Sequence, residues 1–190
     1  MTPRPGLNQD MIVDRALQLA EEGGLSTVTM ANLARSFSIK PPSLYNHFRN
    51  LHEIKQSMAL KAQDMLYDHL KKSVNKEVEP VERLQEMAKH YVTFANRYPG
   101  IYEASLIAPD LNEGVYQNGE EPLVQLLQKY LEPFSLPDRE TIHAIRGLRS
   151  LLHGLVDLHK KEGFKLGIEI EESRIYLVEA FLKGIEWNHK

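Results

Sequence analysis

The stretch TMANLARSFSIKPPSLYNHF, residues 29–48, decides which fold this sequence predicts. Thr29 can cap a short helix, and Ser38-Ile39 indicates a tight turn where that helix ends. We expect a next helix to begin at Pro41 and to end near Phe48, because prolines are tolerated in a first helical turn. Two short helices joined by a turn of about three or four residues are typical of a helix-turn-helix, whose second helix enters the major groove of DNA.

The second helix of this motif is expected to have an apolar and a polar side. Leu44 and Phe48 lie one helical turn apart, so we expect both to face the core. Short polar side chains can meet base edges, while basic or phenolic groups can donate hydrogen bonds to phosphates. The residues predicted to point outward are Lys40, Pro42, Ser43, Tyr45, Asn46 and His47. Two alternatives stay open: Lys40 can be exposed without a role, and Tyr45 and His47 can pack against a neighbouring helix.

Basic residues concentrate in the same part of the chain. Between residues 24 and 63, five lysines and arginines stand against one glutamate and give a net charge of +4. The rest of the chain carries −7, which yields the overall charge of −3. An acidic body with one basic end fits a localised site for a polyanion, although ordinary solvated surfaces show the same bias.

Helical spacing of apolar residues dominates the rest of the chain, with Asn8 and Asn50 as expected N-terminal caps. Beyond the motif, helices are expected at residues 9–23, 50–74, 80–98, 123–130, 138–162 and 171–188, with two further short helices and a loop at 112–119. The sequence thus predicts an all-α protein of about nine helices. We expect an N-terminal three-helix helix-turn-helix domain at residues 1–56 that binds DNA. A C-terminal helical domain is expected at residues 57–190.

The two final helices are apolar around an unusually large part of their circumference. The apolar or small side chains of residues 138–162 cover an arc of about 200°, whereas a surface helix needs only about 100°. One interpretation is that both helices are buried centrally by their own chain. We favour a homodimer seam, in which two helices from each subunit form a four-helix bundle with two-fold symmetry. The predicted interface residues are Gly147, Ser150, Leu151, Gly154, Leu158, Tyr176, Val178, Phe181, Leu182 and Ile185.

Residues 29–34 (TMANLA) and 39–48 (IKPPSLYNHF) resemble the TetR/AcrR family of transcriptional regulators. The strongest signature of that family is Leu-Tyr-x-His-Phe at the end of its recognition helix, which stands here at residues 44–48. The similarity covers about residues 8–58, the whole DNA-binding domain of the family. It implies that the DNA-contacting positions are Thr29, Lys40, Ser43, Tyr45, Asn46 and His47.

Two positions differ from the pattern of the family. Leu51 stands where a phosphate-binding lysine is usual, and Lys40 stands where a capping serine is common. Arg49, His52 or Lys55 can restore the missing charge, and we therefore add Arg49 to the predicted DNA-binding residues.

The resemblance also implies a mechanism. The two recognition helices of a homodimer would lie in successive major grooves about 34–36 Å apart and read a palindromic operator on double-stranded DNA. A small-molecule effector in the C-terminal body would change that spacing through the long helix at residues 50–74, which both domains share. The expected function is therefore that of a ligand-responsive repressor.

Part of the C-terminal region resembles one subclass of this family, named for a Trp-His-Gly motif. The similar segments are residues 98–102 (YPGIY), residues 152–156 (LHGLV) and Gly163-Phe164, and Arg149 lies near the expected place of the tryptophan. An effector pocket is expected in the same region, where one or two cations can pair with an acidic ligand. The candidate residues are Tyr91, Phe94, Tyr98, Tyr102, Ile107, Leu127, Arg146, Arg149, Leu152 and His153. Each of them can instead be structural.

Two other functions remain as alternatives. A helical enzyme or metal-binding protein can be built on His153 and Asp157, whose spacing puts both on one helix face. The pair is two ligands short of a tetrahedral metal site, and no catalytic motif accompanies it. A dimeric interaction protein that has lost DNA binding is favoured only by Leu51. We therefore expect no enzymatic activity, no cofactor and no metal.

The composition excludes further classes of protein. The chain has no cysteine, which excludes disulfides, thiolate catalysis and cysteine-based zinc sites. The first ten residues lack the apolar stretch of a secretory signal. The longest apolar run, residues 175–178, is far shorter than the roughly 18–20 residues that span a bilayer. We expect a soluble, cytoplasmic protein with no membrane partner.

Overall fold

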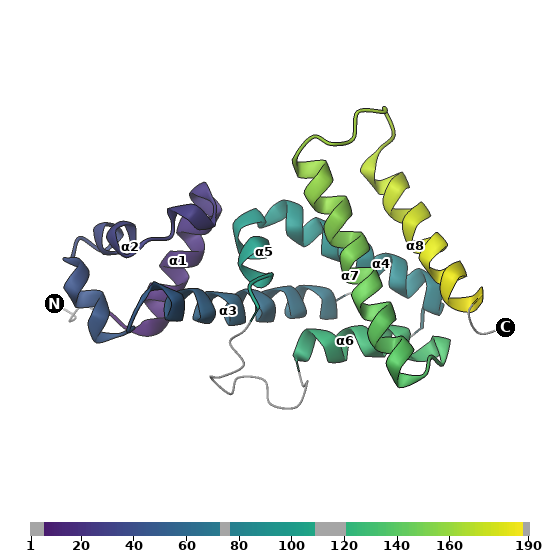
Figure 1. The fold of residues 1–190 in the computed structure, drawn as a ribbon, viewed down its shortest axis with the longest axis horizontal. Helices are drawn as coiled ribbons and strands as arrows, with labels where there is room; N and C mark the ends of the chain where they lie inside the picture. Colours follow the sequence, from purple (N-terminus) through teal and green to yellow (C-terminus); the bar gives the residue numbers. More distant parts are fainter. Residues whose placement is uncertain (1–5, 73–76, 109–120, 188–190) are drawn as a thin grey trace. The chain divides into compact units, whose positions relative to one another are not determined.

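The computed structural model describes residues 6–72, 77–108 and 121–187, and within these ranges all of its regular elements are helices (Figure 1). The all-α prediction is therefore confirmed. The described residues belong to two compact units: unit 1 is Met1–Met65 with Tyr98–Asn118, and unit 2 is Leu66–Arg97 with Gly119–Lys190. The predicted helix ends at residues 74 and 188 and the predicted loop at 112–119 lie outside the described residues.

The two units do not follow the predicted domain boundary after residue 56. Helix α3 (Leu51–Lys71) belongs to both units, and the chain returns to unit 1 at Tyr98 after contributing to unit 2. There α5 (Pro99–Ser105) packs on α1 (Gln9–Gly23). A segment from the middle of the chain therefore completes unit 1, which a boundary at one position cannot describe.

Unit 1 holds a small helical head around the predicted helix-turn-helix. After α1 follow η1 (Leu25–Thr27), α2 (Met30–Ser36), η2 (Pro41–Asn46) and the first part of α3. Both predicted caps are confirmed, since Asn8 Oδ1 accepts a hydrogen bond from Met11 N and Asn50 Oδ1 accepts one from Glu53 N, each at 2.9 Å. Gly24 ends α1 with a φ of 79°, in the left-handed region that glycine adopts at little cost.

The elements of the head share one apolar core. Helical spacing gathers the apolar residues of α1 on a single face, and the other elements cover that face. Side chains with no exposed surface are Ile12, Ala16, Leu33, Leu44, Ile54, Met58 and Ala59. Burial of each large side chain contributes about 1.5–3 kcal/mol, so this core fixes where the polar sides of α2 and η2 point.

The backbones of α1 and α5 approach each other closely at Gly100. A Cβ atom at this position would lie 2.2 Å from Ala20 O and 2.5 Å from Glu21 N, so only glycine fits. The Glu21 side chain strengthens the same junction, because its Oε1 accepts a hydrogen bond from Ile101 N at 2.6 Å. This bond satisfies one of the free N–H groups in the first turn of α5.

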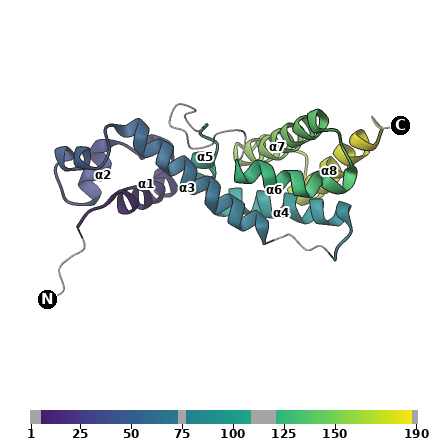
Figure 2. The same cartoon turned by 90° about the horizontal axis from the view of Figure 1, so that it is seen from below.

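Unit 2 is a bundle built from the second part of α3 and from later helices. These are α4 (Pro80–Arg97), α6 (Pro122–Leu131), η5 (Glu132–Phe134), α7 (Asp138–Lys160) and α8 (Ile170–Trp187). α6 packs against α7 (Figure 2), and α7 also packs on α4 and α8. The bounds of α7 and α8 agree with the predicted helices to within two residues. None of the described helices is both long enough and apolar enough to span a membrane.

A buried arginine joins α8 to α4. Arg174 is 3% exposed and donates two hydrogen bonds to the Glu171 carboxylate, at 2.8 and 2.9 Å. It also donates to the backbone oxygen and the amide oxygen of Gln85 on α4, at 2.8 and 2.7 Å. Gln85 Nε2 donates in return to Ile175 O at 3.0 Å. The guanidinium of Arg174 holds the pKa of Glu171 below its ordinary value.

Helix α8 has two apolar sides, and the predicted dimer interface divides between them. Val178 and Leu182 were predicted to face a second subunit but are 0% and 4% exposed, because they fill the core of their own unit. The other eight predicted interface residues keep at least part of their surface exposed, with Leu158 at 48% and Tyr176 at 71%. α7 and α8 run side by side (Figure 1), and a Cβ at Gly147 would lie 3.3 Å from the Phe181 ring.

Two histidines pack together where α3 meets α4. The rings of His69 and His90 have centroids 5.2 Å apart, and the Phe94 ring lies 5.4 Å from His69. Burial and the neighbouring His90 lower the pKa of His69, so its neutral form is favoured in the folded chain. The pair thus packs largely as aromatic rings.

Replacing Gly100 with alanine is expected to lower the free energy of unfolding by about 1–3 kcal/mol, because the Ala20 backbone leaves no space for a methyl group. Urea unfolding monitored by circular dichroism measures the effect. Gly167→Ala is the control, since no atom lies within 4 Å of a Cβ added there, and it should change stability by less than about 0.5 kcal/mol. Equal effects of both variants would contradict the close approach of α5 to α1.

Glu171→Gln is expected to be less stable than the wild type at pH 7, by about 1 kcal/mol because the carboxylate is half exposed. The lowered pKa means that the carboxylate stabilises the fold above the pH where an ordinary glutamate titrates. The difference should disappear as the pH falls through the lowered pKa, which urea unfolding at several pH values measures. Glu172→Gln is the control, because it lies in the same first turn of α8; an equal loss there would assign the effect to the helix dipole.

Candidate nucleic-acid interface

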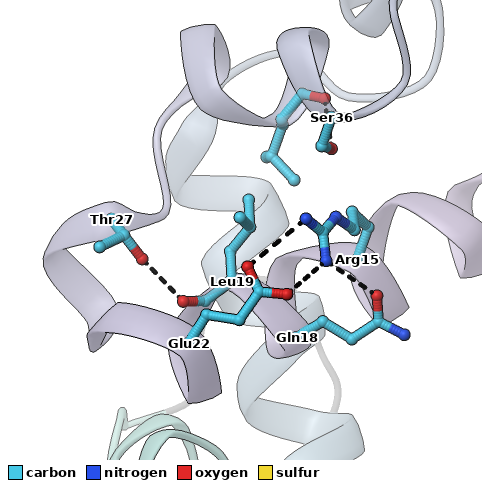
Figure 3. Close-up of polar contacts among 7 residues, drawn as sticks. Arg15, Gln18, Leu19, Glu22, Thr27 and Ser36 are labelled. Atoms are coloured by element: carbon cyan, nitrogen blue, oxygen red, sulfur yellow. Dashed lines mark hydrogen bonds and ion pairs between the residues drawn. The ribbon is translucent and has the colours of Figure 1, made fainter.

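Hydrogen bonds anchor α2 to the end of α1. Thr27 Oγ1 donates to Leu19 O at 2.8 Å (Figure 3), which ties η1 to the last turn of α1. Thr27 O accepts a bond from Asn32 Nδ2 at 2.8 Å, and Thr29 Oγ1 accepts one from Asn32 N at 3.1 Å. Thr29 is therefore the N-cap of α2, as predicted. Because the Thr29 hydroxyl accepts this bond, its hydrogen stays available to an outside acceptor.

The turn between α2 and η2 is tight and well bonded. Ser38 has a φ of 57°, which lies in the left-handed region, and Ile39 N donates to Ala34 O at 3.0 Å. This pattern ends a helix and reverses the chain within a few residues. The predicted turn at Ser38-Ile39 is therefore confirmed, and Ile39 is half-buried beneath it.

The second helix of the motif is a 3₁₀ helix, whereas the sequence predicted a longer helix from Pro41 to about Phe48. Its span is Pro41–Asn46, and Ser43 N donates to Lys40 O while His47 N donates to Leu44 O, at 3.0 and 2.9 Å. Pro41 and Pro42 occupy the first turn, where N–H groups have no intrahelical partner, so they are compatible with a 3₁₀ helix as well as with an α-helix. Short 3₁₀ segments are frequent connectors of this kind.

The structure confirms which residues of this segment face inward. Leu44 and Phe48 are 0% and 3% exposed and belong to the core of the head. Of the predicted DNA-binding residues, Lys40, Pro42, Tyr45, Asn46 and Arg49 are exposed, while Thr29, Ser43 and His47 are half-buried. Tyr45 is 54% exposed, so the alternative that it packs against a neighbouring helix is wrong.

One contact that fixes the interface was not expected from the sequence. Gln9, the first residue of α1, donates a hydrogen bond from Nε2 to His47 O at 2.6 Å. It thereby joins the start of α1 to the end of η2, two segments separated by 38 positions. In the sequence, Gln9 is only a polar residue at the start of a helix. Such residues are too common for the sequence alone to predict this contact.

The positive charge of the head is less than the sequence count suggested. Lys61 forms an ion pair with Asp14 of α1, and this carboxylate lies outside the stretch for which the charge was counted. Arg49 Nε lies 3.4 Å from Glu53 Oε2, with the Arg49 side chain 76% exposed. Lys40, at the start of η2, remains exposed next to the polar side of the segment. A loose pair such as Arg49–Glu53 is weak in water and can be exchanged for a phosphate contact.

The residues predicted for an effector pocket are divided between the two units. Tyr98, Tyr102 and Ile107 belong to unit 1, and the other seven belong to unit 2. In unit 2, the four apolar or aromatic candidates are buried in the core: Tyr91, Phe94, Leu127 and Leu152. Arg146 is exposed, and Arg149 and His153 are half-buried. The hollows described below in unit 2 are lined by other residues.

The residues of the alternative metal or catalytic site lie on α7. Asp157 Oδ2 accepts a hydrogen bond from Lys161 Nζ at 2.9 Å, and this bond lowers the pKa of Asp157. Among the described residues, no three acidic, histidine or cysteine side chains are grouped so that they could hold a metal ion. Asp157 therefore has a structural contact on the helix surface.

Two family models match the chain. Residues 12–54 match the model described as bacterial regulatory proteins, tetR family, which covers the helix-turn-helix. Residues 84–181, more than half of the chain, match the model described as tetracyclin repressor-like, C-terminal domain. The two matches lie on either side of most of α3.

A curated relative and two solved structures show the same relationship. YobS of Bacillus subtilis (strain 168), an uncharacterized HTH-type transcriptional regulator, is 37% identical over 191 residues, which cover 100% of this chain and 98% of YobS. A TetR variant from Acinetobacter baumannii AYE in complex with minocycline is 17% identical, with a TM-score of 0.70 over 97% of this chain and 99% of that chain. BioQ with its double-stranded DNA operator is 18% identical, with a TM-score of 0.66 over 95% and 98%. These structures share the fold, and the chain belongs to the tetR family of bacterial regulatory proteins, which are helix-turn-helix transcriptional regulators.

Proposed function

We propose that this regulator is a ligand-responsive repressor that binds a palindromic operator as a homodimer. The observation that carries the proposal is the polar side of η2, which is exposed while Leu44 and Phe48 anchor its apolar side. In this proposal Ser43 and Asn46 read base edges. The residues that position the head on phosphate and sugar groups are Thr29, Lys40, Pro42, Tyr45, His47 and Arg49. The BioQ structure with its operator supports this use of the fold.

The outer sides of α7 and α8 support a dimer. Between these helices a groove of about 540 Å³ is lined by Leu136, Glu140, His143, Ala144, Ala180, Phe181, Gly184 and Ile185. Exposed apolar side chains such as Leu158 and Tyr176 continue the same sides, and large apolar patches on soluble proteins commonly mark interfaces. We assign this surface to a second copy of the chain, packed as a symmetric four-helix bundle.

The proposed effector acts through α3, which is shared by the two units. An effector can release DNA only if it binds one arrangement of the dimer more tightly than the other. The minocycline complex of the TetR variant supports a small-molecule effector. The segments at residues 98–102 and 152–156 support assignment to the Trp-His-Gly subclass. Because its target is genomic DNA, we also propose that the protein acts in the cytoplasm.

Selection of bound duplexes from a random DNA pool is expected to yield a palindromic consensus, with half-sites one helical turn apart. Asn46→Ala should relax the preference at one symmetric pair of positions, by about 1–3 kcal/mol per base pair. Sedimentation of the wild type should show a dimer at micromolar concentration. A chain that enriches no sequence and still sediments as a dimer would support the alternative of an interaction protein without DNA binding, which Leu51 favours.

Arg49→Ala is expected to weaken binding to all DNA sequences and to lower the slope of log affinity against log salt by about 1 per bound subunit. The reason is that each exposed Arg49 side chain would release about one counterion from a phosphate. Fluorescence anisotropy with the selected duplex and with an unrelated duplex, at several salt concentrations, measures both quantities. Arg139→Ala, an exposed cation at the start of α7, is the control and should leave the slope unchanged. An unchanged slope in Arg49→Ala would refute the phosphate contact.

A further inference from the structure

A second hollow of unit 2 lies among the end of α3, the start of α4 and α6. Its volume is about 440 Å³, within the range of about 300–1,000 Å³ that is usual for small-molecule sites. The lining residues are Tyr67, Lys71, Arg83, Leu126, Lys129, Tyr130 and Glu132. None of them belongs to the residues that the sequence suggested for an effector.

The hollow is strongly cationic for a protein with a net charge of −3. Three of its side chains are cations, Lys71, Arg83 and Lys129, and Glu132 is its one carboxylate. Within the part of the chain that the structure describes, none of the three cations forms a salt bridge. Three cations against one carboxylate leave an excess of positive charge, so an anion placed among them is stabilised.

Arg83 has hydrogen-bonding capacity that the described residues leave unused. Its Nε atom is buried and has no hydrogen-bond partner among them. Its Nη2 atom makes one long bond, to Val78 O at 3.4 Å. A buried unpaired donor costs about 1–3 kcal/mol, and a guanidinium fork matches a carboxylate or phosphate with two parallel bonds. Arg83 is therefore suited to hold an anion from one side of the hollow.

The other walls of the hollow are aromatic and apolar. Leu126 and Tyr130 are 5% and 2% exposed, and the Tyr130 hydroxyl is already bound to Leu70 O at 3.0 Å. The Tyr67 ring is half-buried, with Lys71 Nζ 5.5 Å from its centroid. A ligand that fits must therefore have an anionic head for the cations and a flat or apolar body for the rings.

We propose that this hollow binds an organic carboxylate with an aromatic or apolar body, and that this ligand is the effector of the regulator. The effector role rests on the function proposed above, whereas binding itself does not. Tyr67 and Lys71 lie on the last turns of α3, and η2 precedes the first turn of the same helix. A ligand that draws Lys71, Arg83 and Lys129 together changes the free energy of the contacts among α3, α4 and α6. It thereby acts on the helix that carries the DNA-binding segment.

Titration calorimetry of the full-length protein with 1-naphthoate tests the proposal, with 1-naphthalenemethanol and 1-naphthylmethylammonium as neutral and cationic probes of nearly the same shape. We expect naphthoate to bind one site per subunit, at least tenfold more tightly than the alcohol, and the ammonium not to bind. Arg83→Gln and, as a second variant on the rim, Lys129→Gln should each weaken naphthoate at least tenfold. Lys89→Gln, an exposed cation on α4 outside the hollow, is the control.

The outcomes separate this site from the proposed function. Naphthoate binding that the alcohol matches, or that neither variant weakens, overturns the anion site while operator binding by the same protein stands. Binding that the variants weaken, with operator affinity unchanged by naphthoate, overturns the effector role. Two results together support the whole proposal. The variants lose naphthoate binding but still bind the selected operator, and naphthoate weakens operator binding by the wild type. Circular dichroism establishes that each variant is folded.

Discussion

The burial of Leu44 and Phe48 is the constraint on which the DNA-facing surface depends. η2 spans six residues, two of them prolines, and a 3₁₀ segment of that length is not stable by its own backbone bonds. What holds it is side-chain burial, at about 1.5–3 kcal/mol for each of the two anchors, with the Gln9 bond to His47 O at its end. Because the anchors lie four residues apart, two of the three residues between them, Tyr45 and Asn46, face outward, while His47 is half-buried. The packing of the core thus determines which polar side chains this surface exposes.

Helix caps and apolar spacing, which depend only on residues close in the sequence, predicted most of the elements of the head. Contacts between segments distant in the sequence could not be predicted. The caps Asn8, Thr29 and Asn50 and the inward pair Leu44 and Phe48 follow from local spacing and backbone chemistry. The 3₁₀ form of η2 was missed because prolines in a first turn are compatible with either helix type. Gly100 against Ala20 and Lys61 with Asp14 join residues far apart in sequence. The count of cations therefore overestimated the charge of the head.

The C-terminal helices show why a periodic pattern cannot assign partners. The sequence indicated more apolar surface on the last two helices than one contact needs, and the structure sends Val178 and Leu182 inward while Tyr176 stays outward. Arg174 settles this rotation of α8, because its guanidinium is satisfied only when it reaches Gln85 on α4. A buried polar group needs particular hydrogen-bond partners, whereas a buried apolar group does not. Arg174 therefore fixes which side of α8 stays exposed. Residues of the cationic hollow were missed for a related reason: they come from three segments, and each alone reads as a solvated cation.

The cationic hollow and the DNA-binding segment are linked by the continuity of α3. Lys71, Arg83 and Lys129 repel one another, so the empty hollow favours arrangements that separate them, and an anion favours arrangements that bring them together. The coupling between the two sites is one free energy that both share. If the anion lowers the affinity of the dimer for DNA by a given factor, bound DNA must therefore lower the affinity for the anion by the same factor. The coupling cannot exceed the difference in anion affinity between the two arrangements. Arg83 is the most buried of the three cations, so solvent screens its interaction with an anion least and it contributes most to that difference.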